Sequence, residues 1–171
     1  PLDMRRLRLA TLGDLDPTQA IEVSQALALE TGAVSDRQHL VGLLLGAGTA
    51  QTALPVIRRL LADGAVKAGD AIRYSVAVTG DDLSLAKQLW RHAMKEGVPE
   101  TFLLHALSQG YRLGLDDEVA PLMPRMAERA QSGAGDVWTF DVEDLPALIT
   151  QRRSEVEDVH GKLLDGLIPI H

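Results

Sequence analysis

Histidines and paired carboxylates are the side chains in this sequence that could do acid–base chemistry or bind a metal ion. The five histidines are His39, His92, His105, His160 and His171. No two of them stand at the helical spacing that lets two imidazoles share a metal ion on one face. His92 lies beside the apolar face of a predicted helix, and His105 lies within the run FLLHAL. We therefore interpret both as packing side chains.

Acidic clusters precede two of the predicted helices, at Asp81–Asp82 and at Asp116–Glu118. Carboxylates in that position satisfy free backbone amides and oppose the positive end of the helix dipole, so capping explains them without catalysis. The charged run EVEDVH at 155–160 fits a solvated helix face. No phosphate-binding glycine loop and no Gly-x-Ser-x-Gly elbow is present. We predict no enzymatic activity, no cofactor and no metal site.

Composition limits the classes of partner. The chain has 171 residues, a net charge of −7, 46% hydrophobic residues, 4% aromatic residues and no cysteine. Excess negative charge disfavours nucleic acid and anionic membranes, and no apolar run is long enough to span a bilayer. We expect a cytoplasmic protein. Because the chain starts at Pro1 and ends on the apolar run LIPIH, we also expect a fragment of a larger protein.

Helix start and stop signals divide the chain into short segments and predict an all-α fold. Residues with a capping side chain precede the segments, and glycines end them. The predicted caps are Asp16 (followed by Pro17), Ser35, Thr49 or Thr52, Asp81 or Asp82, and Asp116 or Asp117; the predicted terminators are Gly32, Gly64, Gly97 and Gly114. Pro124 should kink the helix in which it lies or remove one of its hydrogen bonds.

Equivalent residues recur at a constant step of 33 positions. The matching sets are Ala53, Ala86 and Val119; Ile57, Trp90 and Met123; Leu60, Ala93 and Met126; Leu61, Met94 and Ala127; and Gly64, Gly97 and Ala130. A period of about this length with two helices is typical of stacked helical hairpins, which bury their apolar faces only against their neighbours. A helical bundle without repeats would produce some of these coincidences as well.

The stretch GDDLSLAKQLWRHAMKEGVPETFLLHALSQGYRLGLDDEVAPLM resembles tetratricopeptide and pentatricopeptide repeats, and the resemblance covers about residues 39–130. It implies a TPR-like α-solenoid, or a right-handed helical array, over residues 1–133. We expect a short extended segment and a C-terminal helix over 134–171 to pack on that array. The run LLDGLIPIH is similar to helical segments of large bacterial repeat proteins.

The array predicts a non-enzymatic scaffold that holds a protein or peptide partner, or another domain of the same chain, on the surface of its stacked first helices. One alternative is a structural or regulatory domain of a larger multidomain enzyme or nucleic-acid-processing protein; another is RNA binding through a pentatricopeptide-like face. The candidate partner-binding residues are Trp138 and Phe140, which could instead plug the end of the array, and the basic cluster Arg5, Arg6 and Arg8, which could instead be a solvated helix end.

Overall fold

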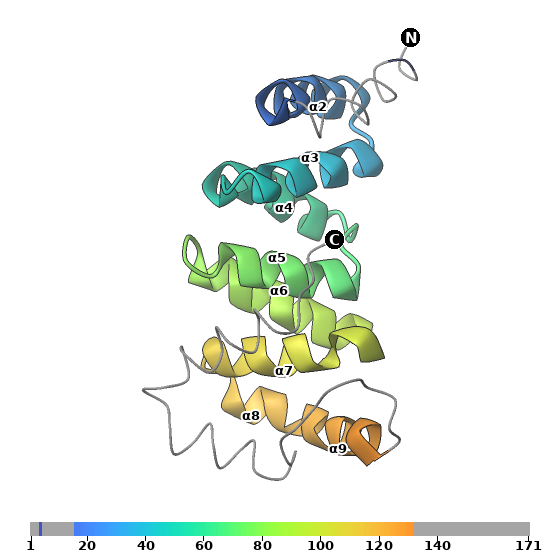
Figure 1. Cartoon of the computed structure of the whole chain (residues 1–171), viewed down its shortest axis with the longest axis vertical. Coiled ribbons are helices and arrows are strands. Elements are labelled where there is room, and N and C mark those ends of the chain that lie inside the picture. Colours follow the sequence, from blue (N-terminus) through green and yellow to red (C-terminus); the bar gives the residue numbers. More distant parts are fainter. Residues whose placement is uncertain (1–3, 5–15, 132–171) are drawn as a thin grey trace.

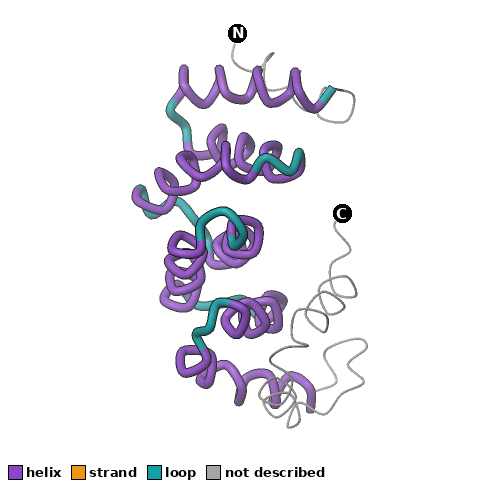
Figure 2. The backbone as a smooth tube through the Cα atoms, turned by 90° about the vertical axis from the view of Figure 1, so that its left-hand side faces the viewer, coloured by secondary structure: helices purple, strands orange, loops and turns teal. Residues whose placement is uncertain are grey.

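The computed structural model of the protein describes residue 4 and residues 16–131. These residues form helices and connecting turns without a strand, which confirms the all-α prediction for this part of the chain. The helices are α2 (Pro17–Thr31), α3 (Val34–Gly46), α4 (Ala50–Ala62), α5 (Ala68–Val78), α6 (Leu83–Glu96), α7 (Leu103–Arg112), α8 (Asp116–Val119) and α9 (Met123–Gln131), with 3-10 turns η1 (Glu100–Phe102) and η2 (Ala120–Leu122). Figure 1 shows them stacked along the long axis from α2 to α9, and Figure 2 shows successive layers rotated relative to one another.

Two of the predicted caps are confirmed by hydrogen bonds. The Asp16 carboxylate accepts from the Gln19 amide at 3.1 Å, and the Asp82 carboxylate accepts from the Leu85 amide at 2.9 Å. Pro17 occupies the first turn of α2, where its missing N–H costs nothing. These contacts fix where α2 and α6 begin.

The other predicted caps are wrong. Helix α3 begins at Val34, before Ser35, and has no side-chain cap. Thr49 precedes α4, but its hydroxyl donates backward to the Leu44 carbonyl at 2.8 Å. Asp116 and Asp117 lie inside the first turn of α8 rather than before it. From there their negative charges still favour the positive end of the helix dipole.

Proline interrupts the last helical segment. Helix α8 ends at Val119, a 3-10 turn holds Pro121, and α9 resumes at Met123 immediately before Pro124. A proline in a helix interior has no N–H to donate and crowds the preceding turn. The sequence predicted one helix with a kink or a lost hydrogen bond at Pro124, whereas the structure has two short helices joined by a 3-10 turn.

Four helices begin at a constant interval. Helices α2, α4, α6 and α8 start at Pro17, Ala50, Leu83 and Asp116, and each start follows the one before by the same step that relates the matching sets of the sequence. We call these four the second helices, because α4, α6 and α8 each follow a first helix, namely α3, α5 and α7. Their equivalent positions are buried in each: Ala20, Ala53, Ala86 and Val119 are all 0% exposed. The sequence comparison identified the last three members of this set, and α2 adds a fourth at the same spacing.

The apolar core is continuous from α3 to α9. Its largest fully buried side chain is Trp90, whose indole N–H donates to the Ala106 carbonyl at 2.6 Å. Helix α2 is attached differently, because its buried residues Ala20 and Leu27 form a separate small cluster. Ile21 and Ala28 of α2 nevertheless pack against the main core, so α2 contributes to both clusters.

Candidate binding groove between α2, α3 and α4

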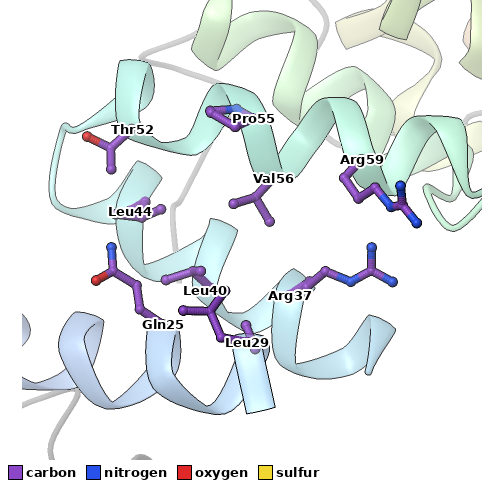
Figure 3. Close-up of a pocket in the computed structure, with 10 residues that line it drawn as sticks. Gln25, Leu29, Arg37, Leu40, Leu44, Thr52, Pro55, Val56 and Arg59 are labelled. Atoms are coloured by element: carbon purple, nitrogen blue, oxygen red, sulfur yellow. The ribbon is translucent and has the colours of Figure 1, made fainter. Parts of the chain in front are cut away.

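An open groove of about 380 Å³ lies between α2, α3 and α4 (Figure 3). Three helices form it, and most of its lining is apolar. The lining residues are Gln25, Ala28 and Leu29 from α2; Arg37, Leu40 and Leu44 from α3; and Thr52, Pro55, Val56 and Arg59 from α4. In Figure 3 the two arginines gather at one end, while Gln25 and Thr52 lie toward the other.

The floor and rim of the groove differ in exposure. Leu40 and Leu44 are buried and belong to the main core. Leu29 is 87% exposed, the most exposed large hydrophobic side chain in the described part of the chain. The groove has an apolar floor and an exposed leucine at its edge. Binding of another apolar group there would remove apolar surface from water, which is favourable.

The charged residues of the groove lining are Arg37 and Arg59. Arg37 and Arg59 both bind one carboxylate, that of Asp63, at 2.7 Å and 3.3 Å. The hydrogen bond from Arg37 is the largest cause that lowers the pKa of Asp63, so this carboxylate stays ionised. The two guanidinium groups of the groove lining therefore share the Asp63 carboxylate.

A comparison of equivalent positions in the second helices identifies a polar contact that the groove lacks. Between α6 and α8, Arg91 donates to both carboxylate oxygens of Glu118, at 2.8 Å and 2.6 Å. Two repeat steps of 33 positions before Arg91 and Glu118 lie Gln25 in α2 and Thr52 in α4. Both of these counterparts line the groove. No hydrogen bond joins Gln25 to Thr52 among the described residues. We call the ion pair between Arg91 and Glu118 the polar clasp of the α6/α8 junction. The α2/α4 junction has no such clasp.

The α4/α6 junction has a clasp of the same kind. Arg58 of α4 binds Asp82, the cap of α6. One step earlier these positions hold Gln25 and Thr49, and Thr49 is bonded within its own turn to the Leu44 carbonyl. Both comparisons therefore identify Gln25 as the position that lacks a bridging arginine.

A second difference concerns the arginine at the rim. In α9, Arg125 donates to the Val98 carbonyl at 2.9 Å and also binds Glu100. Its counterpart two steps earlier is Arg59, and the counterpart of the Val98 carbonyl is that of Gly32. That carbonyl already accepts from Arg37 at 3.2 Å. Arg59 consequently stays at the groove edge, with its side chain 71% exposed.

The histidines that the sequence analysis assigned to packing are not gathered into a site. The His92 ring nitrogen Nε2 lies 2.7 Å from the Val66 carbonyl and ties α6 to the turn before α5. His105 is half-buried beside Phe102, with ring centres 6.0 Å apart. Burial is the main cause that lowers the pKa of His105, with Arg73 contributing. Among residue 4 and residues 16–131, no group of three potential metal ligands occurs.

The acidic clusters have structural partners as well. Asp82 caps α6, and this backbone bond is the main cause that lowers its pKa. Glu118 faces Arg91, whose hydrogen bond lowers the pKa of Glu118. Both carboxylates belong to the junctions described above and lie outside the groove lining.

The sequence-predicted contact residues Trp138, Phe140, Arg5, Arg6 and Arg8, together with the C-terminal helix and the segment 134–171, lie outside the described residues. The groove was missed by sequence reasoning, although a signal for it exists. When α2 is aligned with α6 and α4 with α8, Gln25 and Thr52 occupy the places of Arg91 and Glu118. The groove is lined by two second helices and α3, whereas the sequence led us to expect a surface of first helices.

No protein-family model, curated protein or solved structure matches this chain. In the described part of the chain, every helix is too short or too polar to cross a bilayer. The groove and the charges around it are therefore the grounds for assigning a function.

Proposed function

We propose that this chain is a helical-repeat interaction module of tetratricopeptide-like, stacked-hairpin architecture that holds part of a partner protein in the groove between α2, α3 and α4. The four second helices support the repeat, because their starts are evenly spaced along the chain and their equivalent small residues are all buried. Stacked hairpins suit binding since each unit is supported by its neighbours, which leaves an extended surface free for a ligand.

One observation carries the choice of surface: the polar clasp that joins α6 to α8 is replaced by Gln25 and Thr52 at the junction where the groove opens. An exposed leucine, Leu29, lies at the same place. The lining residues include no histidine, carboxylate or cysteine. Their chemistry suits apolar contact and hydrogen bonding, so the proposed activity is binding.

The proposal can be tested by closing the groove with the chain's own clasp. The double variant Gln25→Arg with Thr52→Glu installs at α2/α4 the residues found at α6/α8. The matched control, Arg91→Gln with Glu118→Thr, performs the reverse exchange at α6/α8. Partners co-purified from the source cells by the unmodified chain should be lost by the closing variant and retained by the control.

Circular dichroism on the same preparations shows whether each variant keeps its helices. Folded closing and control variants that capture the same partners as the unmodified chain would show that the groove is not the binding surface. Loss of partners by the control alone would place the binding surface at the α6/α8 junction instead.

A further inference from the structure

We infer that the ligand of this groove is an internal peptide segment of a partner protein in which an aspartate or glutamate side chain adjoins two or three apolar side chains. The carboxylate would lie between Arg37 and Arg59, and the apolar side chains would lie over Leu29, Leu40 and Val56. This inference rests on the function proposed above and adds the chemistry of the partner.

Unused hydrogen-bond donors support an acidic ligand. A guanidinium group has five N–H donors in a planar fork that matches a carboxylate. Arg59 uses its Nε toward Asp63, and its two terminal nitrogens make no hydrogen bond within the described structure. The Nε of Arg37 also has no acceptor among the described residues, but it is buried and out of reach of a ligand. A further carboxylate could engage donors that Asp63 leaves free.

Comparison with the last repeat position identifies a second carboxylate that Arg59 lacks, in addition to Asp63. Arg125, the counterpart of Arg59, is matched by the carboxylate of Glu100. The position two steps before Glu100 is Val34, which carries no charge. An acidic side chain from outside would therefore supply at Arg59 what Glu100 supplies at Arg125.

The lining determines the rest of the ligand. Leu29, Leu40 and Val56 offer apolar contact between the two polar ends. At the end away from the arginines, Gln25 and Thr52 carry donors and acceptors suited to a peptide backbone. The groove offers two arginines beside an apolar floor, and the chain has a net charge of −7. This arrangement suits a single carboxylate better than the many phosphates of a nucleic acid. Because the groove is open, a segment from the middle of a chain can pass through it.

The test begins with selection from a random peptide library displayed on phage, with the closing variant Gln25→Arg with Thr52→Glu as the counter-selecting surface. Enriched sequences are then made as acetylated and amidated peptides, so that glutamate or aspartate supplies the only carboxylate. Each peptide is compared with its glutamine or asparagine analogue by fluorescence anisotropy. We expect the acidic peptide to bind about tenfold or more tightly than its neutral analogue, as charge-assisted hydrogen bonds predict.

Two arginine variants locate the carboxylate. Arg59→Gln should weaken binding of the acidic peptide about tenfold and leave the neutral analogue nearly unchanged. Arg58→Gln is the matched control, because Arg58 is the adjacent exposed arginine of α4 and binds Asp82 outside the groove. It should change binding by less than about twofold.

The outcomes separate this inference from the function on which it rests. Enriched peptides without an acidic preference, or binding that needs a free C-terminal carboxylate, would overturn the inference and leave groove binding intact. Self-association that disappears in the closing variant would make a second copy the occupant and would also overturn it. If no peptide binds the unmodified chain more tightly than the closing variant, the proposed function fails as well.

Discussion

Replacing Gly110 with alanine tests a close contact between helices, because among the described glycines an added Cβ would meet its nearest neighbours at Gly110. Gly110 lies in α7 against two neighbouring helices, and a Cβ there would be 2.3 Å from Val119 Cγ2 and 2.8 Å from Trp90 Cζ2. Val119 is 0% exposed and Trp90 is 1% exposed, so neither can turn toward solvent. The bond from the Trp90 indole to the Ala106 carbonyl further restrains the ring. One added methyl must therefore shift packed side chains or backbone.

The magnitude follows from two opposing effects. Overpacking a dense core costs about 1–3 kcal/mol, and contacts this short correspond to the upper part of that range. Alanine recovers about 1 kcal/mol through its higher helix propensity. Gly110→Ala should therefore lower the free energy of unfolding by about 2 kcal/mol. Gly42→Ala is the matched control, because Gly42 also lies within a helix and a Cβ there meets nothing within 4 Å. It should raise the free energy of unfolding by up to about 1 kcal/mol.

Urea unfolding followed by far-ultraviolet circular dichroism measures both variants. For a chain of this length, a loss of about 2 kcal/mol corresponds to a fall in melting temperature of about 4–8 °C. Opposite signs for the two alanine variants are the expected result. A Gly110→Ala variant as stable as the unmodified chain would refute the close approach of α7 to α6 and α8.

Substitutions at three further positions test the local arguments. Burial and the charge of Arg73 lower the pKa of His105, so the folded state favours the neutral imidazole. The contribution of His105 to the free energy of unfolding should therefore be complete above the unfolded pKa of 6.5 and should decline as the pH falls toward the lower folded pKa. Urea titrations at about pH 7.5 and pH 5.5 measure this decline, which His105→Leu should remove; an identical decline in the variant would assign it elsewhere. Trp90→Phe should cost about 2–4 kcal/mol of unfolding free energy by leaving a cavity and removing the donor to the Ala106 carbonyl, and a loss under about 1 kcal/mol would contradict the buried hydrogen bond. Asp82→Ala should cost about 1 kcal/mol by removing the acceptor at the start of α6, while Asp82→Asn, which keeps a capping oxygen, should recover most of it in the same urea assay.

The sequence predicted the fold best where local signals and long-range packing agree. Asp16, Pro17 and Gly32 mark the ends of α2 by cap and turn chemistry, and the structure follows them. Ser35 and Thr49 carry the same capping chemistry but do not cap, because the tight connections around them set the helix starts differently. A side chain that could cap cannot show which of several nearby backbone geometries packing will select.

The groove was harder to predict because two residues at its lining, Gln25 and Thr52, differ from the charged residues at the equivalent positions of other repeats. Gln25 and Thr52 are ordinary helix-surface residues when considered alone. Their meaning appears only when α2 is aligned with α6 and α4 with α8, and the sequence comparison had placed α2 outside the repeating set. Likewise, Arg59 is exposed while Arg37 donates to the Gly32 carbonyl. The sequence alone does not show which of the two arginines makes this hydrogen bond.

The central claim is that the α2/α4 junction differs from the α6/α8 junction by being open and able to bind. A nitrogen–proton correlation NMR titration with the selected acidic peptide compares the two junctions in one experiment. Saturable shifts at the amides of Leu29, Leu40 and Val56, with Arg91 and Glu118 unchanged, are the predicted result. Shifts centred on Arg91 and Glu118, or shifts in the groove that persist undiminished in the Gln25→Arg with Thr52→Glu variant, would contradict the account.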